Sequence, residues 1–460
     1  MLTGVSFRAY PNKEQGLTLS QWMGCAKFIW NAKCAEDNYL IQFARRYLPI
    51  GTYPEVDQKY SQYKTHELVP WLFDCPSSIL RNTTTNWFKT RQKHMKGICG
   101  RPRKKKRGGK GSIHLTNDMF RFEKCSDGNT RLFIGAKRNN IGYLSFKAHR
   151  NFKEPKSIYI IKRHGKYWVS FAYEDGFSEE HLKSAEEYLK SLRGCSKEEL
   201  EEYTIGIDRG VVRPVQAGDK VYDFSEEQKR NLKKNDCSTV KAQKKLARQE
   251  KGSNRSKKTK QYIGRTSEHS SNIRKDFSHK TTRKLVDDEK TKVFIIEDLR
   301  TSQMTKKSKP KKDEKTGKYL PNNRRAKGKL NKSILGSCWF SIEYCLSYKA
   351  YRKGKVVFKV SARFTSQECA DCGHTHPNNR KRQDLFVCES CGHSVNADYN
   401  AAEVIKKRAI NLILDSGTEL SKGGVLLDRG RGATYKSRSA NALLASGYEA
   451  SKKKETAIAA

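Results

Sequence analysis

The chain has 460 residues, of which 36% are hydrophobic and 10% aromatic, so it is long enough to fold as several packed domains. Its 93 lysines and arginines exceed its 49 acidic residues and leave a formal net charge of +44. Such an excess repels itself unless a polyanion lies nearby, so we expect nucleic acid as a partner. A basic protein that only coats nucleic acid or an acidic membrane is the alternative.

The sequence also limits where the protein works. It has no run of about 18 apolar residues and no secretory pattern at its start, so we expect a cytoplasmic protein without a membrane span. Thirteen cysteines are present, nine of them scattered and four in two tight pairs. This usage is typical of a reducing compartment and one metal site rather than of a disulfide framework.

The first part of the chain alternates between strand and helix patterns. Val5, Phe7 and Ala9 alternate with polar residues, which predicts a strand over 1–10. Near-helical spacing of apolar residues then predicts helices up to about Met95, within a helical unit at 11–109. Short alternating runs at 110–176 predict a small antiparallel sheet or barrel, with a hairpin around Arg163 to Gly165.

The second part begins with helical patterns at 177–203, where we expect a linker with one helix over 178–194 and another after a capping box at Ser196 and Glu199. Strands then alternate with helical stretches through 204–362 and 393–415, which predicts an α/β core. We expect two basic segments, 301–332 and the tail 416–460, to be poorly ordered on their own.

Three acidic residues follow apolar segments. Asp208 ends TIGID and Glu297 ends VFIIE, so each lies in or at the end of a buried strand, where an ionised carboxylate is costly unless it binds a cation. Asp398 lies near the start of a predicted helix, where it could simply be an N-terminal cap. Together the three could hold two divalent cations for phosphodiester hydrolysis. Asp298 would face the opposite side of its strand, so we rank it second.

Four cysteines have the spacing of a zinc site. They form two C-x-x-C pairs, each followed by glycine and histidine, and the segment that separates the pairs has the length found in zinc ribbons. A redox dithiol is the alternative, but it needs only one pair. We therefore predict one structural Zn²⁺, with the nearby histidines as neighbours rather than ligands. The proposed ligands are Cys369, Cys372, Cys388 and Cys391.

Basic and aromatic side chains supply candidates for nucleic-acid contacts. The Gly/Pro/basic run at 100–111 holds six candidate phosphate-binding residues, and the runs at 229–260 and 306–332 are similar in composition. Arg363, just before the first cysteine pair, is a candidate contact for the scissile phosphate. The tryptophans of the N-terminal part could stack on bases, although aromatics at helical spacing more often lie in a core. The six basic candidates are Arg101, Arg103, Lys104, Lys105, Lys106 and Arg107.

With these residues assembled, the chain resembles the TnpB (OrfB) family, transposon-encoded RNA-guided DNA nucleases related to compact type V CRISPR effectors and to Fanzor proteins. The resemblance rests on GIDRG at Asp208, VFIIEDL at Glu297 and the segment from Phe364 to Ile405, which reads FTSQECADCGHTHPNNRKRQDLFVCESCGHSVNADYNAAEVI. It extends more weakly to YPNKEQ, GCAKFIWN, VPWL, GRPRKKK and DFSHKTTRKLV. The tail after residue 415 lies outside it.

The resemblance implies a multidomain α+β fold. A β-barrel wedge domain at 1–10 and 110–176 would carry an inserted helical recognition domain at 11–109. An RNase H-like (RuvC) nuclease domain at 204–362 and 393–415 would contain the zinc finger at 363–392. Asp208, Glu297 and Asp398 would be its catalytic acids and would bind two Mg²⁺ or Mn²⁺ ions.

The resemblance also implies partners and a reaction. A guide RNA derived from the transposon end would pair with double-stranded target DNA, and one acidic site would cut both strands. The protein would work in a prokaryotic cytoplasm near the nucleoid, or in a nucleus if the host is eukaryotic. A transposase, a guide-RNA-dependent DNA-binding regulator that does not cut and an unspecific RNA-binding protein are the alternatives. The guide sequence, the adjacent DNA motif, the cut positions and the oligomeric state do not follow from the sequence.

Overall fold

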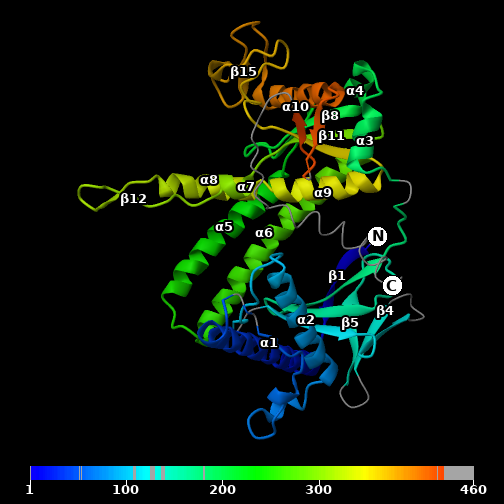
Figure 1. Cartoon of the computed structure of the whole chain (residues 1–460), viewed down its shortest axis with the longest axis vertical. Coiled ribbons are helices and arrows are strands. Elements are labelled where there is room, and N and C mark those ends of the chain that lie inside the picture. The colour runs from blue at the N-terminus through cyan, green and yellow to red at the C-terminus, as the bar shows by residue number, and fades with distance from the viewer. Residues whose placement is uncertain are drawn as a thin grey trace. The chain divides into compact units, whose positions relative to one another are not determined.

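The protein is a multidomain α+β chain. Its structure, a computed structural model, describes residues 2–50, 52, 54–106, 110–124, 130–135, 140–179, 182–421 and 423–428. The chain divides into two compact units, Met1–Glu179 and Glu180–Ala460 (Figure 1). In the part that the structure describes, no helix is both long and apolar enough to cross a membrane.

The first unit contains a seven-stranded antiparallel sheet with the order β2-β6-β7-β1-β5-β4-β3. Its two outer strands, β2 and β3, are consecutive in the chain and are joined by residues 117–119 alone. Because four residue steps span at most about 14 Å, the two edges of the sheet must curve toward each other. The strands are β1 (Leu2–Tyr10), β2 (Gly111–Thr116), β3 (Phe120–Lys124), β4 (Thr130–Gly135), β5 (Asn140–Lys147), β6 (Ser157–Arg163) and β7 (Lys166–Glu174).

The predicted hairpin in this sheet is confirmed. β6 and β7 pair from Tyr159 opposite Ser170 to Arg163 opposite Lys166. Their two-residue turn consists of His164 and Gly165, which have φ angles of 47° and 77°. Positive φ at both positions is what a tight turn needs to match the twist of the flanking strands.

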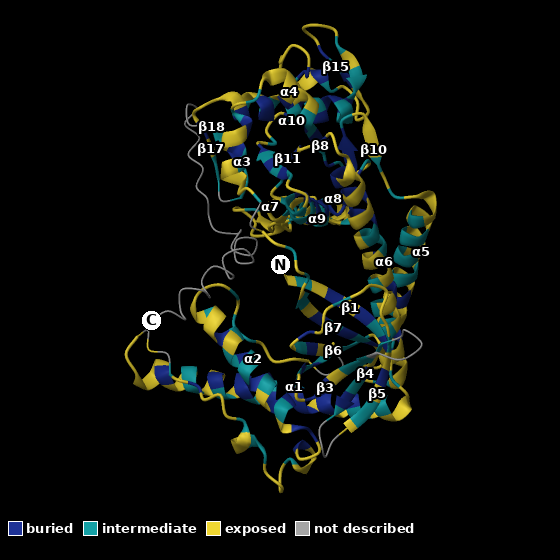
Figure 2. Cartoon of the chain, turned by 90° about the vertical axis from the view of Figure 1, so that its right-hand side faces the viewer, coloured by how far each residue is buried: buried dark blue, intermediate teal, exposed yellow. Residues whose placement is uncertain are grey.

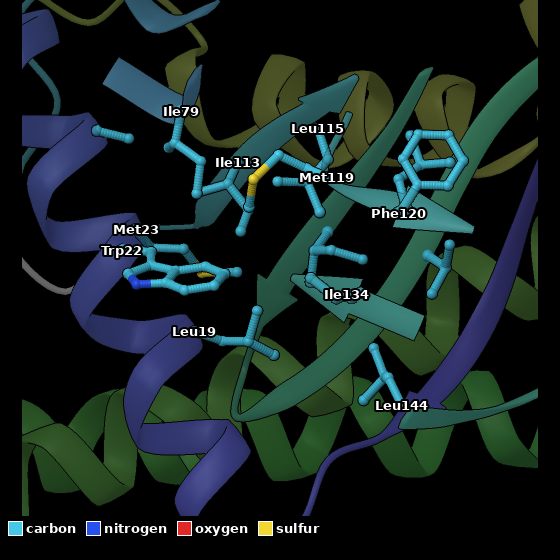
Figure 3. Packing of buried hydrophobic residues seen from close by; sticks show 14 of the residues in the cluster. Leu19, Trp22, Met23, Ile79, Ile113, Leu115, Met119, Phe120, Ile134 and Leu144 are labelled. Atoms are coloured by element: carbon cyan, nitrogen blue, oxygen red, sulfur yellow. The ribbon is translucent and has the colours of Figure 1, made fainter. Parts of the chain in front are cut away.

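Two long helices complete the core of the first unit. Helix α1 (Lys13–Tyr47) starts after Pro11 with a capping box between Asn12 and Gln15. Helix α2 (Ser77–Met95) and the short turns η1 (Ser61–Tyr63) and η2 (Pro70–Leu72) follow it. Figure 3 shows Trp22 of α1 directed toward the strands, among the apolar residues of the core. Trp22 and Trp87 are only 2% and 1% exposed, so the core interpretation holds for both.

The second unit contains a five-stranded sheet with the order β10-β9-β8-β11-β14. The three strands β8, β11 and β14 are parallel, β9 runs antiparallel to β8, and β10 runs antiparallel to β9. Strands alternate with helices along this part of the chain, so the α/β core that the sequence predicts is present. The strands are β8 (Thr204–Asp208), β9 (Val215–Ala217), β10 (Lys220–Tyr222), β11 (Val293–Glu297) and β14 (Val356–Val360).

Helices cover both faces of this sheet. Val293 and Ile295 pack with α10 (Ala397–Leu414), whereas Phe294 and Ile296 pack with α6 (Asn254–Asp287) and α9 (Trp339–Arg352). The alternation follows from the period of two along a strand. Helix α5 (Glu226–Ala247) lies beside α6 as a long hairpin with many exposed side chains (Figure 2).

Two helix predictions need correction. Helix α3 covers Ala185–Leu192 rather than 178–194, because Ser184 and Glu187 form the capping box that starts it. Helix α4 (Lys197–Tyr203) starts at the predicted box. Both helices bury leucines in the core of the second unit. The sequence also predicts one long Lys/Arg-rich helical stretch from about Glu226 to Lys290, but the structure interrupts it at 248–253, where Gly252 has a φ of 92°.

The two segments expected to be poorly ordered contain regular structure. Residues 301–336 form α7 (Thr301–Met304), the hairpin β12 (Lys311–Lys312) and β13 (Tyr319–Leu320), and α8 (Arg324–Gly336). Side-chain amides hold them together, since Asn331 donates to the carbonyl oxygen of Thr305. In the tail, β17 (Thr418–Leu420) pairs with β18 (Leu426–Asp428) because Leu426, 3% exposed, enters the core. The prediction for 429–460 lies outside the described residues.

Candidate functional site

Asp208 and Glu297 lie at the carboxyl ends of neighbouring parallel strands. Ile296 of β11 is in register with Ile207 of β8, so the two acids occupy adjacent positions across the sheet. Glu297 follows Ile295 by two residues and therefore faces α10, and Asp208 lies on the same face as Gly206, which touches α10. Parallel strands gather functional groups at this edge.

Asp398 comes from the helix that covers this face. It lies in the first turn of α10, and the N-cap is Asn396, whose side chain accepts hydrogen bonds from the backbone N–H groups of Asp398 and Tyr399. Helix α10 packs tightly on β8, because a Cβ on Gly206 would come within 2.0 Å of the carbonyl oxygen of Ala402 (Figure 1). Glycine at position 206 thus allows the close approach that carries Asp398 to the sheet edge.

The three carboxylates interact electrostatically. Burial, followed by the negative charges of Glu297 and Asp398, raises the pKa of Asp208 from 3.8 to about 7. Burial also raises the pKa of Glu297, against the opposing effects of a hydrogen bond from Thr365 and the charge of Arg209. A buried acid whose ionisation is disfavoured by burial and by neighbouring carboxylates, as that of Asp208 is, is typical of a site that takes up a cation.

Two residues that the sequence reasoning missed contact these acids. The Thr365 hydroxyl, which is buried, donates a hydrogen bond to Oε1 of Glu297. The Arg380 guanidinium lies 3.4 Å from Oδ1 of Asp398, and its charge also lowers the pKa of Asp208. Arg380 lies between the two cysteine pairs, so its proximity depends on the path of that loop, which residue spacing does not reveal.

A buried ionic network supports the strand ends from the opposite face. Arg209, 3% exposed, donates to the backbone carbonyl oxygen of Glu297 and forms an ion pair of 2.9 Å with Glu343 of α9. Lys359 of β14 lies 2.6 Å from the other carboxylate oxygen of Glu343. Burial alone would raise the pKa of Glu343, but the charges of Arg209 and Lys359 outweigh it and lower that pKa. This network fixes the β8, β11 and β14 ends relative to α9.

The four predicted cysteines come together at one point. Their sulfur atoms all lie within 4.8 Å of one another, and the Cys369–Cys391 and Cys372–Cys388 separations are 3.7 and 3.6 Å. A tetrahedral Zn²⁺ with Zn–S bonds of about 2.3 Å requires sulfur separations of about 3.8 Å. The cluster can therefore hold zinc. Across the described ranges, no other group of three or more metal-ligating side chains is drawn together this tightly, the three acids included.

The two cysteine pairs form matching knuckles. Gly373 and Gly392 have φ angles of 75° and 71°, which L-amino acids with side chains rarely adopt. Burial would raise the pKa of the Cys388 thiol, but hydrogen bonds from the backbone of Cys391 and Ser390 lower it to about 7. A thiol of low pKa is more fully ionised near neutral pH, and the thiolate is the form that binds metal. In the same cluster, burial raises the pKa of Cys369. A backbone hydrogen bond lowers the pKa of Cys391, but hydrogen bonding to the other cysteines outweighs it and raises that pKa.

The knuckles are attached directly to the helix that carries Asp398. Strand β15 (Leu385–Val387) pairs with β16 (Ser394–Asn396), which leads into α10, and the turn η3 (Pro377–Asn379) lies in the same loop. The buried Asn400 side chain accepts from the N–H of Ala370 and donates to the carbonyl oxygen of Glu368. The Lys407 and Arg408 side chains of α10 also bond to this segment. Order in the cysteine cluster therefore determines where α10 begins.

The remaining predicted residues lie near the surface. Arg363 is exposed, with its guanidinium 4.9 Å from the ring centre of Phe364, and follows β14 at the edge that carries the acids. Asp298 lies near Arg300, at 3.8 Å. Arg101 is engaged by Asp37 in a partly buried ion pair, which differs from a free phosphate contact. Four basic candidates are exposed, namely Arg103, Lys104, Lys105 and Lys106. The Lys105 ammonium also lies over the Trp30 ring. Arg107 lies outside the described residues.

Comparisons with known proteins agree with these motifs. Three family models match the chain: "Helix-turn-helix domain" of OrfB_IS605 at residues 1–36, "Probable transposase" of OrfB_IS605 at 180–308, and "Cas12f1-like, TNB domain" at 339–405. The last two include all three acids and all four cysteines. Within residues 1–36 the structure has β1 and most of α1 rather than two helices.

Several named proteins are similar to this chain. "Putative RNA-guided DNA endonuclease InsQ" of Escherichia coli (strain K12) is 28% identical over 408 residues, which cover 88% of this chain and 91% of that protein. "Putative RNA-guided DNA endonuclease" of Streptomyces pristinaespiralis is 23% identical, covering 87% of each. The structure of a "Cas12f1-sgRNA-target DNA complex" aligns with 13% identity and a TM-score of 0.45, covering 88% of this chain and 98% of that one. The chain is therefore similar to OrfB_IS605 proteins in two matched segments, 1–36 and 180–308, and to curated RNA-guided DNA endonucleases along nearly its full length.

Proposed function

We propose that this protein is an RNA-guided, Mg²⁺-dependent DNA endonuclease encoded by an insertion sequence. One observation carries the proposal: Asp208, Glu297 and Asp398, far apart in sequence, gather at one face of the sheet edge, where burial and the charges of the other two acids raise the pKa of Asp208. Relatives along nearly the full length are named RNA-guided DNA endonucleases, which supports the same reading.

The acids would act as metal ligands. Carboxylate oxygens are the donors that Mg²⁺ prefers, and the mutual repulsion around Asp208 is what a bound cation relieves. Two such ions, when bound, activate a water molecule and stabilise the leaving oxygen of a phosphodiester. Thr365 holds the Glu297 carboxylate in one orientation, and Arg380 offers a positive charge toward the phosphate beside Asp398. Arg363 is a second candidate contact for that phosphate.

The cysteine cluster would have a structural role. Cys369, Cys372, Cys388 and Cys391 would bind one Zn²⁺ and, through Asn400 and the β15–β16 hairpin, fix the start of α10. A redox dithiol needs only one pair, whereas the sulfur atoms of both pairs lie within 4.8 Å of one another, as a single four-ligand zinc site requires. Zinc would therefore position Asp398 without taking part in cleavage.

The fold is compatible with the domain assignment that the family implies. Three parallel strands flanked by an antiparallel pair, with helices on both faces, fit an RNase H-like (RuvC) domain at 204–362 and 393–415, and the zinc finger would occupy 363–392. The curved sheet fits a wedge barrel at 1–10 and 110–176, and α1 and α2 fit a recognition domain at 11–109. Residues 177–203 would connect the two parts.

A guide RNA and double-stranded target DNA are the proposed partners. The net charge of +44 can neutralise a long stretch of phosphates. Exposed basic residues at 103–106 and along α8 are suited to contact the backbone without reading bases. A guide-dependent regulator that does not cut is the second candidate, but such a protein has no need to retain all three acids, and this chain retains them.

The test is cleavage by the purified complex. The RNA that copurifies with the protein is sequenced first. The protein is then loaded with an RNA of that kind that carries a chosen guide, and the complex is incubated with matching DNA and Mg²⁺. We expect guide-directed cleavage, its loss in Asp208→Ala, and unchanged RNA binding in that variant. Cleavage that persists in Asp208→Ala would contradict the assignment of the site, and strand-transfer products on transposon-end DNA would favour a transposase.

A further inference from the structure

Phe364 has a backbone conformation that its side chain disfavours. Its φ angle is 61°, in the left-handed region, and its side chain is 48% exposed. Bulky residues without polar atoms are outliers in this region, because the Cβ crowds the backbone. Burial of the ring does not explain the conformation. Where the structure describes the chain, the other non-glycine residues with positive φ are His164 in a tight turn, Asn323 and the buried Cys338.

Neighbouring groups hold this turn in place. The Arg408 guanidinium of α10 donates to the carbonyl oxygens of Ser361 and Arg363, at 3.2 and 2.8 Å, and is paired with Glu368. The next residue, Thr365, donates its hydroxyl to Glu297. The contacts that fix the metal-binding acid therefore also fix the direction in which Phe364 projects. Strain that is maintained in this way concentrates at functional sites.

The exposed ring has a positive partner. The Arg363 guanidinium lies 4.9 Å from the ring centre of Phe364, and no acidic partner of Arg363 is found in the described ranges. An exposed aromatic ring beside an unpaired guanidinium offers a flat apolar surface and a positive charge together. A nucleotide has the complementary pair of features, a base with a π face and a phosphate with a negative charge.

We propose that Arg363 and Phe364 form a nucleotide-binding platform beside the acids, with Phe364 stacked on a base of the DNA strand being cut and Arg363 paired with an adjacent phosphate. This inference rests on the proposed nuclease function. Stacking accepts any base, which suits an enzyme whose target is chosen by a guide. The platform would hold the strand at a fixed distance from Glu297, because both are set by the same turn.

Three substitutions separate the ring from the backbone conformation. Phe364→Leu keeps an apolar side chain without a π face, Phe364→Asn suits a positive φ better than phenylalanine does, and Phe364→Trp keeps the ring. Each variant is loaded with the copurifying guide RNA and assayed for kcat/KM on matching DNA. In Ca²⁺, the fluorescence of 2-aminopurine placed next to the mapped cut position reports stacking. Melting temperature and zinc content report folding.

We expect Phe364→Leu and Phe364→Asn to lose about tenfold or more in kcat/KM and to lose the fluorescence quenching, while Phe364→Trp keeps both. Phe364→Asn should melt no lower than the original protein. Wild-type cleavage by the Leu and Asn variants, or unchanged quenching, would overturn the proposal. An equal loss in all three variants would also overturn it, since the turn rather than the ring would then matter. Absence of any guided cleavage by the unsubstituted protein would instead refute the proposed function.

Discussion

Replacing Asp208 by asparagine should stabilise the protein and inactivate it at the same time. Asparagine has the shape of aspartate but no charge, so it removes the cost of burying that charge and the repulsion from Glu297 and Asp398, without leaving a cavity. The Asp208 pKa of about 7 lies above its ordinary value of 3.8. The unfolded chain is therefore ionised at position 208 above about pH 4, while the folded protein retains the proton up to about pH 7.

The sign and size of the effect follow from this difference. Stability is lost as the pH rises from about 4 to 7, and at pH 8 the full cost is present, about 4 kcal/mol for a pKa rise from 3.8 to about 7. Asp208 is partly exposed, and water lowers such a cost, so we expect Asp208→Asn to stabilise the second unit by about 2 kcal/mol. This corresponds to an increase of roughly 4–8 °C in melting temperature.

The assay is thermal unfolding at pH 8 in EDTA, compared with pH 5, where the gain should be smaller. Asp219→Asn serves as the control, since Asp219 is an exposed carboxylate of the same unit. Added Mg²⁺ should then stabilise the unsubstituted protein but not Asp208→Asn, because ligands stabilise only the state that binds them. If Asp208→Asn melts at or below the temperature of the unsubstituted protein at pH 8 in EDTA, burial and the neighbouring acids do not disfavour the Asp208 charge as described.

Three further substitutions test the support of the site. Thr365→Val should raise the Mn²⁺ concentration needed for half-saturation by about tenfold, because one hydrogen bond to a charged group is lost. Thr365→Ser keeps the hydroxyl and should leave that concentration unchanged. Calorimetry of Mn²⁺ binding distinguishes the two variants. Cys388→Ser should reduce the zinc content, measured by mass spectrometry. It should also loosen the start of α10, so that amide hydrogen exchange increases around Asn400. Unchanged exchange would contradict the proposal that the cysteine cluster fixes α10. Gly206→Ala should destabilise the second unit by about 3 kcal/mol, because its Cβ would overlap the Ala402 carbonyl oxygen. Gly336→Ala is the control and should be tolerated, because its Cβ meets open space. Equal melting temperatures of the two variants would refute the close contact at Gly206.

The alternation of side chains along strands explains why Glu297 could be ranked above Asp298 without a structure. Because Ile295 is buried on the α10 face, Glu297 must share that face and Asp298 must not, which is the ranking that the sequence gives. The cysteine pairs were predictable for a similar reason, since zinc geometry demands their local spacing.

Other features depend on contacts between segments far apart in the chain. Thr365 and Arg380 reach the acids only because their loop folds back over α10, and neither has a distinctive local pattern. The start of α3 depends on which of several serines forms a cap, and Ser184 was not singled out. Strands β17 and β18 have only three residues each, so their order comes from docking Leu426 on the core rather than from local propensity.

The central claim is that Asp208, Glu297 and Asp398 hold divalent ions in common. Its most direct test is a structure of the protein with guide RNA, uncleaved target DNA and Mn²⁺, with the ions located by anomalous scattering. We predict ions bound at about 2.1 Å by oxygens of all three carboxylates, next to a phosphate of the DNA. Ions bound elsewhere, or one of the three carboxylates left outside the coordination sphere, would contradict the account.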